Sequence, residues 1–268
     1  MNRKFDISGK VVVITGGAGL LGTMHAEAIA ENGAIPILFD SNHNEAKKKA
    51  EKIKKKYNVP CFPFKGDVSK EKNINELIKF LAKRKLKIDV LINNAAVNPK
   101  LNKKENNGAF EKLTLKNWNY ELNVGLTGAF LCSKIIGKKM MENKKGIIIN
   151  ISSDLGIIAP DQRLYANKKK NSFYKPATYS VIKHGIIGLT KYMATYWADK
   201  GIRVNCLCPG GIYEKQEKNF IKKINKLIPM GRMAQADEYK GAIQFLSSDA
   251  SSYMNGATLI VDGGRTIW

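Results

Sequence analysis

The sequence predicts an α/β fold, a doubly wound parallel sheet of about seven strands that forms a single domain over residues 1–268. Short apolar runs alternate along the chain with longer amphipathic segments, a pattern typical of a parallel sheet covered by helices on both faces. Hydrophobic residues make up 44% of the chain, which is enough for a full core, and no linker-like stretch divides it.

The first half of the chain contains four expected strands and three expected helices. The third helix carries Ile74, Leu77, Ile78 and Leu81 at helical spacing, so these residues form one apolar face. The expected elements of this half are strands at Val11–Thr15, Ile35–Phe39, Cys61–Phe64 and Ile88–Asn93, and helices at about Leu21–Asn32, Asn44–Tyr57 and Lys72–Lys85.

The second half repeats this order of elements. In a doubly wound sheet the ligand crevice lies beyond the carboxyl ends of the strands, so we expect the functional residues in the segments that follow them. The expected elements of this half are helices at about Trp118–Asn143, Tyr179–Lys200 and Asp237–Ser247, and strands at Gly146–Ser152, Ile202–Cys208 and Thr258–Asp262.

Composition argues against several other classes of protein. The first residues lack the apolar core of a secretory signal, and every apolar run is far shorter than the roughly 20 residues of a membrane helix. We therefore expect a cytoplasmic protein that does not enter the membrane. Cys61, Cys132, Cys206 and Cys208 show no zinc-type spacing with one another or with histidine, so we expect free thiols and no metal.

The formal net charge of +22 is large enough to attract anionic partners. The basic residues are 39 lysines and only 6 arginines, which indicates a compositional preference for lysine. Runs such as Lys47–Lys49 and Lys54–Lys56 belong to the solvent side of an expected helix. We therefore expect a small-molecule substrate and no nucleic acid, and an anionic substrate stays open.

A glycine-rich turn, TGGAGLLG at 15–22, joins the first strand to the first helix. Gly16, Gly19 and Gly22 permit a tight turn and a close approach of the backbone to a pyrophosphate. The first helical residues, Leu20 and Leu21, add free N–H groups and the positive end of the helix dipole. The sequence therefore predicts a dinucleotide site of the Rossmann type at this turn.

Asp40 ends the second strand about 20 residues further on. A carboxylate at this place binds the ribose hydroxyls of NAD and repels the 2′-phosphate of NADP, so we expect NAD to be preferred. Two alternatives stay open. Asp40 could instead cap the next helix, because Asp is a good N-cap residue, and Asn42 and His43 could partly accommodate a phosphate.

Further short motifs follow in an order that resembles the short-chain dehydrogenase/reductase family nearly from end to end. A single YxxxK string is common by chance, but eight pieces in the family's order are not. The matching pieces are TGGAGLLG at 15–22, Asp67-Val68, NNAA at 93–96, Asn123, NISS at 150–153, YSVIK at 179–183, PGG at 209–211 and VDGG at 261–264.

This resemblance implies an NAD(P)-dependent oxidoreductase that interconverts a secondary alcohol and a ketone. It implies that Ser153 orients and polarises the substrate oxygen, and that Asn123 holds a water in a proton relay. It also implies that Lys183 holds the nicotinamide ribose. The full set of cofactor contacts implied beyond the glycine-rich turn and Asp40 is Asp67, Val68, Asn94, Ala95, Tyr179, Lys183, Pro209, Gly210 and Ile212.

The spacing of Tyr179 and Lys183 makes chemical sense on its own. A phenol with a pKa near 10 is a weak base at neutral pH. Lys183 lies four residues later, so on a helix it occupies the same face. Its charge is expected to lower the pKa of Tyr179 and to let the phenol act as general acid or base.

A second YxxxK string, Tyr165 to Lys169, competes for this role. Its surroundings lack an apolar stripe, whereas the residues after Tyr179 have one, so we favour Tyr179. That choice implies an insertion of about a dozen residues, roughly Gln162–Lys175, near the site. Ser153 is favoured over Ser152 because it matches the family position better, and alternation along a strand points only one of the two serines into the crevice.

The chain departs from the family pattern at three places, one of which is Ala96 in place of the more usual glycine after NNA. The turn has GxxGxxG spacing, which resembles larger relatives that act on sugar nucleotides, but the chain has no room for their extra domain. Tyr213-Glu214 stands where many relatives place a threonine that binds the nicotinamide amide, so backbone groups at Ile212 are expected to do this. The lysine-rich segment Tyr213–Arg232 is expected to cover the substrate.

Relatives with this longer loop suggest a sugar or sugar-derived substrate of bacterial surface-glycan biosynthesis. The enzymatic alternative is a 3-oxoacyl-(acyl carrier protein) reductase, whose usual NADPH dependence disagrees with Asp40. The alternative from another class is a basic nucleic-acid-binding or regulatory protein on the same fold. The family resemblance also implies a homo-oligomer, either a tetramer or a dimer.

Overall fold

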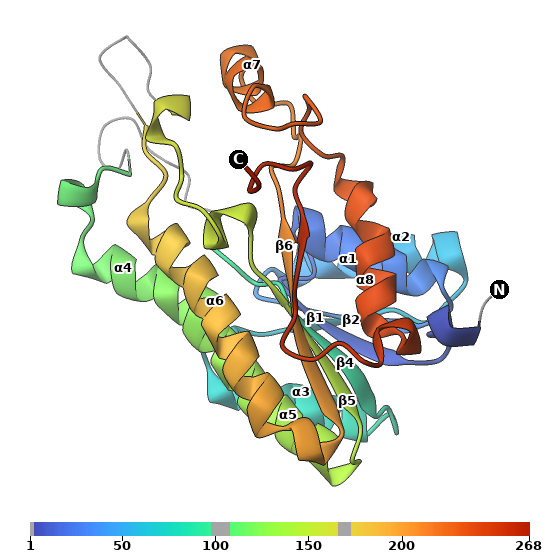
Figure 1. Cartoon of the computed structure of the whole chain (residues 1–268). Coiled ribbons are helices and arrows are strands. Elements are labelled where there is room, and N and C mark those ends of the chain that lie inside the picture. The colour runs from blue at the N-terminus through green and yellow to red at the C-terminus, as the bar shows by residue number, and fades with distance from the viewer. Residues whose placement is uncertain (1–2, 98–107, 166–172) are drawn as a thin grey trace.

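A computed structural model describes residues 3–97, 108–165 and 173–268. It contains one seven-stranded sheet in the order β3-β2-β1-β4-β5-β6-β7, with every neighbouring pair parallel. This confirms the predicted doubly wound sheet (Figure 1). The strands are β1 (Val11–Thr15), β2 (Ile35–Asp40), β3 (Phe62–Lys65), β4 (Ile88–Asn93), β5 (Gly146–Ile151), β6 (Ile202–Pro209) and β7 (Thr258–Val261).

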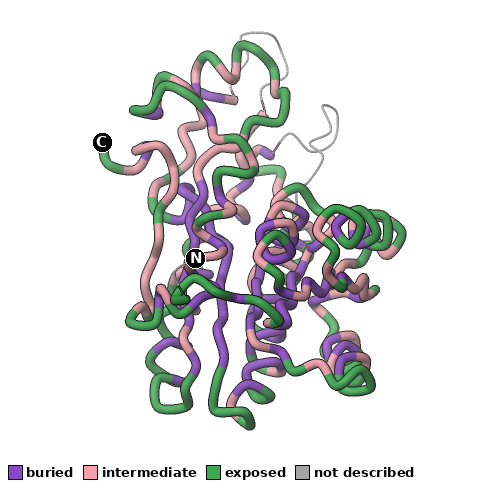
Figure 2. The backbone as a smooth tube through the Cα atoms, turned by 90° about the vertical axis from the view of Figure 1, so that its right-hand side faces the viewer, coloured by how far each residue is buried: buried purple, intermediate pink, exposed green. Residues whose placement is uncertain are grey.

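Helices cover the sheet on both sides, because alternate residues of the central strands are apolar and point to opposite faces. One face packs on α1 (Leu20–Glu31), α2 (His43–Tyr57) and α8 (Lys240–Ser247). The other packs on α3 (Glu71–Ala82), α5 (Gly128–Glu142) and α6 (Ala177–Tyr196). Figure 2 shows the buried strands between these layers of helices. The core therefore has two apolar layers, one on each face of the β-sheet.

The expected long helix Trp118–Asn143 is a chain of three helical pieces. It begins earlier, at α4 (Leu115–Leu122), where the Thr114 side chain accepts a hydrogen bond from the Asn117 N–H at 3.2 Å. A π-helical turn at Asn123–Thr127 then precedes α5. Such turns often mark functional positions in helices.

The other differences between the expected and the observed elements lie at the ends of elements or in the lysine-rich segment Tyr213–Arg232. The expected helix Tyr179–Lys200 is α6, which starts two residues earlier after Pro176 and ends at Tyr196. The expected cover segment contains a helix that the periodicity did not predict, α7 (Lys218–Asn225). One side of this helix is apolar and is formed by Ile224 and neighbouring residues. The helix is too short for its apolar periodicity to be recognised in the sequence.

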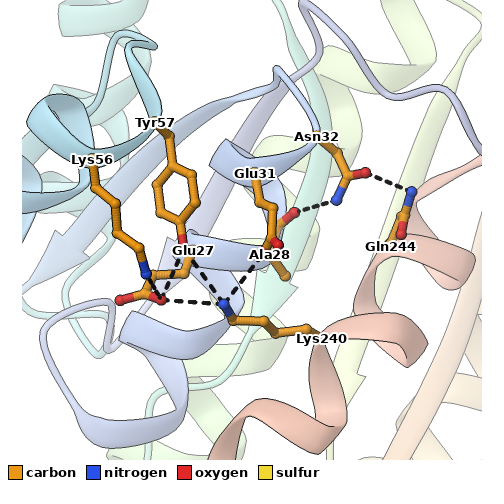
Figure 3. Close-up of polar contacts among 8 residues, drawn as sticks. All are labelled: Glu27, Ala28, Glu31, Asn32, Lys56, Tyr57, Lys240 and Gln244. Carbon is orange, nitrogen blue, oxygen red and sulfur yellow. Dashed lines mark hydrogen bonds and ion pairs between the residues drawn. The ribbon is translucent and has the colours of Figure 1, made fainter.

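A polar cluster ties α1 to its two neighbouring helices (Figure 3). Glu27 of α1 accepts hydrogen bonds from Tyr57 at 3.1 Å and from Lys240 at 3.2 Å, and Lys56 lies 3.3 Å from the same oxygen. Lys240 also contacts Glu31 at 3.1 Å. The cluster therefore holds α1 between α2 and α8 and helps to fix its N-terminus behind the glycine-rich turn.

A search of the helices for a membrane span found none: within residues 3–97, 108–165 and 173–268, no helix combines the length and the apolar character needed to cross a bilayer.

Candidate active site

The glycine-rich turn between β1 and α1 needs its glycines for close approach. Gly16 has a φ of +63°, and a Cβ there would lie 2.9 Å from the Ala95 Cα. A Cβ on Gly22 would lie 2.1 Å from the Gly16 carbonyl oxygen. By contrast, a Cβ on Gly19 would meet only the Gly16 oxygen, at 3.3 Å, so the backbone at Gly19 borders open space.

The N-terminus of α1 faces this open space without a cap. Gly19 is the N-cap residue and supplies no side-chain hydrogen bond. Within the described part of the chain, no acceptor is recorded for the N–H groups of Leu20 and Leu21, which lie in the first helical turn. Free N–H groups and a positive dipole end fit the pyrophosphate of a dinucleotide.

Asn94 and Ala95, at the end of β4, shape the turn from behind. The Asn94 side-chain amide donates to the Thr15 carbonyl oxygen at 2.9 Å and to the Gly16 carbonyl oxygen at 3.2 Å. The backbone N–H groups of both residues donate to the Thr15 hydroxyl at 3.0 Å. The NNAA motif therefore braces the glycine-rich turn through hydrogen bonds to β1.

A cavity of about 260 Å³ opens beside the turn at the ends of β2 and β3. Asp40, Asp67 and Val68 line it, as the expected cofactor contacts require, and no lysine or arginine occurs among its described lining residues. The Asp40 carboxylate accepts hydrogen bonds from the backbone N–H groups of Ala18 at 2.9 Å and of Asn42 at 2.8 Å. Each carboxylate oxygen retains a second lone pair, so it can still accept from a ribose hydroxyl.

The alternative in which Asp40 caps the next helix is wrong. Asn42 is the N-cap of α2, and its side-chain oxygen accepts from the Glu45 N–H at 3.2 Å. Asp40 lies two residues earlier, at the end of β2, where its carboxylate holds the backbone between the strand and the helix.

Ser153, Tyr179 and Lys183 meet where β5 ends and α6 begins. The Lys183 ammonium donates to the Ile151 carbonyl oxygen at 2.8 Å and lies 5.7 Å from the centroid of the Tyr179 ring. The Ser152 hydroxyl donates to the Lys183 carbonyl oxygen at 2.7 Å and so anchors the helix. Ser153 lines the neighbouring cavity instead, as strand alternation predicted.

The pKa of Tyr179 differs from the expectation. Burial raises it, because a phenolate is poorly solvated there, and a hydrogen bond with Ser153 opposes this rise. The expected lowering of the Tyr179 pKa by Lys183 is therefore wrong, and the lysine ammonium is turned to the Ile151 carbonyl. Burial also lowers the pKa of Lys183 to about 8, and the charge of Lys175 adds to this effect.

Asn123 lies in the segment that joins α4 to α5, on a different element from the other three residues. It lies in the π-helical turn with an exposed side chain, and no hydrogen bond from that side chain is recorded within the described residues. Gly125 of this turn faces α6: a Cβ there would lie 2.9 Å from a methyl group of Ile182. A relay role for Asn123 stays a prediction.

A second cavity, of about 240 Å³, lies over Ser153 and Tyr179. Gly210 and Ile212, which follow Pro209 at the end of β6, border it. The Ile212 carbonyl oxygen accepts from the Gln216 side chain at 2.7 Å, and no hydrogen bond of the Ile212 N–H is recorded within the described residues. Part of the cavity wall comes from α7, through Phe220 and Ile224.

The competing Tyr165 also lines this cavity, but from the loop after β5. It packs on Phe220 with the ring centroids 5.5 Å apart, and burial raises its pKa to about 12. Its would-be partner Lys169, like Lys168–Lys170 as a whole, lies outside the described residues. Tyr179 and Lys183 share α6, so the helical pairing that favoured them is present.

Three charged residues of the cavity wall were missed by sequence reasoning. The Lys175 ammonium lies 3.7 Å from the centroid of the Tyr179 ring. Asp154 accepts from the Ser153 hydroxyl at 2.6 Å and from the Arg265 guanidinium at 3.0 Å, and both members of this ion pair are buried. Only Asp154, directly after NISS, carried a local signal.

The described residues contain no group of three or more His, Cys, Asp or Glu side chains arranged to hold a metal ion. All four cysteines are free and buried, as their spacing predicted.

Comparison with known proteins places this geometry among nicotinamide-dependent enzymes. A family model described as enoyl-(acyl carrier protein) reductase matches residues 17–266. The NADP-dependent mannitol dehydrogenase of Alternaria alternata is 35% identical, over 98% of this chain and 94% of its own length.

Two solved structures are similar over almost the whole chain. A gluconate 5-dehydrogenase from Burkholderia cenocepacia, in complex with NADP and tartrate, is 28% identical with a TM-score of 0.87, covering 99% of this chain and 98% of that one. A short-chain dehydrogenase from Leptospira borgpetersenii with bound NAD+ is 33% identical with a TM-score of 0.85, covering 99% and 96%. Sequence, sheet order and these matches agree, and the chain belongs to the short-chain dehydrogenase/reductase family.

Proposed function

We propose that this enzyme is an NAD-dependent dehydrogenase that interconverts a secondary alcohol and a ketone in a polyhydroxylated substrate, a sugar alcohol or a sugar acid. One observation carries the proposal: Ser153 and Tyr179 line the same cavity, at the carboxyl ends of the neighbouring strands β5 and β6. A carbinol in that cavity can therefore meet a proton acceptor at the place where the fold positions a nicotinamide.

The side chains divide the work in the following way. Ser153 orients the substrate oxygen, and Tyr179 takes the carbinol proton during oxidation or returns it during reduction. Bound NAD supplies the acceptor for the hydride. Lys183 stabilises the phenolate through its charge, which matters most when substrate and cofactor exclude water from the site.

The preference for NAD rests on Asp40. Its carboxylate borders the cavity that suits the adenosine end of the cofactor, and no described cation lines this cavity to offset the charge of a 2′-phosphate. The mannitol dehydrogenase relative is named as NADP-dependent, and the Leptospira structure holds NAD+, so the relatives include both cofactors. Initial rates with NADH and NADPH at equal concentration decide this point, and we expect NADH to be favoured.

The proposed substrate class is supported by the named relatives, a mannitol and a gluconate dehydrogenase. The test is a panel of sugar alcohols, sugar acids and their keto forms, followed by absorbance of the nicotinamide. Turnover of at least one of these classes supports the proposal. Turnover restricted to 3-oxoacyl thioesters would instead select the alternative of a 3-oxoacyl-(acyl carrier protein) reductase, the activity for which one relative, 30% identical to this chain, is named.

A homo-oligomer is part of this proposal. Exposed large apolar residues occur on α5 and α6, which lie side by side on one flank of the molecule (Figure 1). They include Phe130, Val181, Tyr192 and Tyr196. A cytoplasmic location, a role in surface-glycan biosynthesis and the absence of a nucleic-acid partner stay predictions.

A further inference from the structure

Lys175 is held in the cavity wall by a precise backbone clamp. The Lys175 N–H donates to the Gln162 side-chain oxygen at 2.9 Å, and the Gln162 side-chain nitrogen donates to the Lys175 carbonyl oxygen at 3.0 Å. The backbone N–H and the backbone carbonyl of Lys175 are thus both hydrogen-bonded to the side-chain amide of Gln162. The clamp fixes the position from which the side chain reaches the face of the Tyr179 ring.

The other charges of this cavity are already paired. Asp154 is paired with Arg265 at 3.0 Å, and Asp161 is paired with Arg163 at 2.9 Å. Lys175 has no ion pair within the described ranges, although it lines the same cavity. Among its described lining residues, the cavity therefore presents one positive charge without an ion-pair partner.

Two carboxylates act on Lys175 from a distance without neutralising it. Asp154 and Glu121 raise its pKa, whereas burial lowers it and has the larger effect. Glu121, on α4, is itself buried and accepts a hydrogen bond from the Thr178 hydroxyl. A partly buried ammonium with neither a carboxylate nor a hydrogen-bond acceptor is costly, and an anionic ligand relieves that cost.

We propose that Lys175 binds the carboxylate of the substrate, so that the enzyme selects sugar acids over neutral sugar alcohols. This inference rests on the proposed function and narrows its substrate class. Because the Lys175 ammonium lies against the Tyr179 ring, a carboxylate bound to it places the polyol chain of the substrate next to the phenol. Charge-assisted hydrogen bonds of this kind are about twice as strong as neutral ones.

The test compares D-gluconate with sorbitol, which differ only in whether one terminal carbon is a carboxylate or a carbinol. For each, kcat/KM is measured in the wild type and in Lys175→Gln. We expect the ratio of gluconate to sorbitol to fall about tenfold to a hundredfold in the variant, since a hydrogen bond to a charged group is lost. Lys175→Arg keeps the charge and should retain most of the ratio.

The matched control is Lys222→Gln, which removes one exposed lysine from α7 without touching the cavity wall. It should leave the ratio unchanged. Equal ratios in the wild type and Lys175→Gln would overturn the proposal. So would a shifted pH profile of kcat at an unchanged ratio, because Lys175 would then act on Tyr179 rather than on the substrate.

Binding of tartrate to the NADH-loaded protein, measured by calorimetry, separates this proposal from the proposed function. Tartrate is the probe because it carries carboxylates and hydroxyls and needs no turnover. Binding that weakens at least tenfold in Lys175→Gln supports the carboxylate site even if no sugar acid or polyol is oxidised. If the enzyme turns over polyols and tartrate binds equally well to the wild type and to Lys175→Gln, the proposed function is supported and this inference is refuted.

Discussion

The turn after β1 presents backbone atoms to its ligand, whereas the cavity over Tyr179 is lined by side chains from segments far apart in the chain. At the turn, glycines and the N-terminus of α1 make the surface. At the cavity, Lys175 comes from the loop before α6, Phe220 from α7 and Arg265 from the C-terminal segment. A common cofactor can be held by general backbone geometry, but substrate choice depends on which side chains the fold brings together.

The largest effect is expected from breaking the buried ion pair of the substrate cavity. Arg265→Met leaves the Asp154 carboxylate buried without its partner, which should lower the free energy of unfolding by about 3–5 kcal/mol. Chemical denaturation measures this loss. Arg163→Met, which breaks an exposed pair, is the control and should change stability little. Equal losses of unfolding free energy in the two variants would show that the buried Arg265–Asp154 pair contributes no more to stability than the exposed pair.

The cofactor end is expected to fail at Gly22. A Cβ there would lie 2.1 Å from a carbonyl oxygen of the turn, so Gly22→Ala should cost about 1–3 kcal/mol of stability and weaken NADH binding. Gly241→Ala, in α8, meets nothing within 4 Å and should instead be stabilising by about 0.4–1 kcal/mol. Denaturation and NADH fluorescence titration measure both effects. An unchanged NADH affinity in Gly22→Ala would mean that the turn accommodates the added methyl group without losing its binding geometry.

Asp40→Asn sharpens the comparison within the cofactor end. The amide keeps one of the two oxygens that accept from the backbone and loses the charge that disfavours a 2′-phosphate. The ratio of kcat/KM for NADH over NADPH should fall about tenfold, the effect of roughly 1.4 kcal/mol. Asp199→Asn removes an exposed carboxylate elsewhere and should leave the ratio unchanged. A constant ratio in Asp40→Asn would assign cofactor choice to other residues.

The pH dependence of stability tests whether Lys183 is a buried cation with a lowered pKa. Because burial lowers its pKa in the folded protein to about 8, the unfolded chain binds more protons at this residue between pH 8 and about 10. Stability contributed by this group therefore rises with pH in that window. Thermal unfolding of Lys183→Met and wild type should show the advantage of the variant shrinking from pH 8 to pH 10. A constant difference would mean that Lys183 keeps its ordinary pKa.

The fold was predictable because its signals are local. Runs such as Val11–Thr15 and Ile147–Ile151 are apolar on both faces, and the glycines of the first turn sit at fixed offsets from the strand. The same holds for Tyr179 and Lys183, whose spacing places them one helical turn apart. Each of these patterns is contained within a few residues.

The residues that sequence reasoning missed depend on long-range packing. Arg265 meets Asp154 across more than a hundred residues of chain, and Lys175 becomes part of the site only because Gln162 clamps its backbone. The predicted direction of the Tyr179 pKa shift was wrong for the same reason. Burial of the phenol and the hydrogen bond from Lys183 to the Ile151 carbonyl oxygen arise only in the packed structure. Periodicity carries no information about such contacts.

The account depends on the phenol of Tyr179 exchanging a proton with the substrate. Its most direct test is kcat of Tyr179→Phe with a substrate identified in the polyol and sugar-acid panel, with NADH binding followed by fluorescence in parallel. Loss of a general acid–base group should lower kcat by about a hundredfold or more while NADH still binds. A Tyr179→Phe enzyme that binds NADH and turns over at the wild-type rate would contradict the assignment.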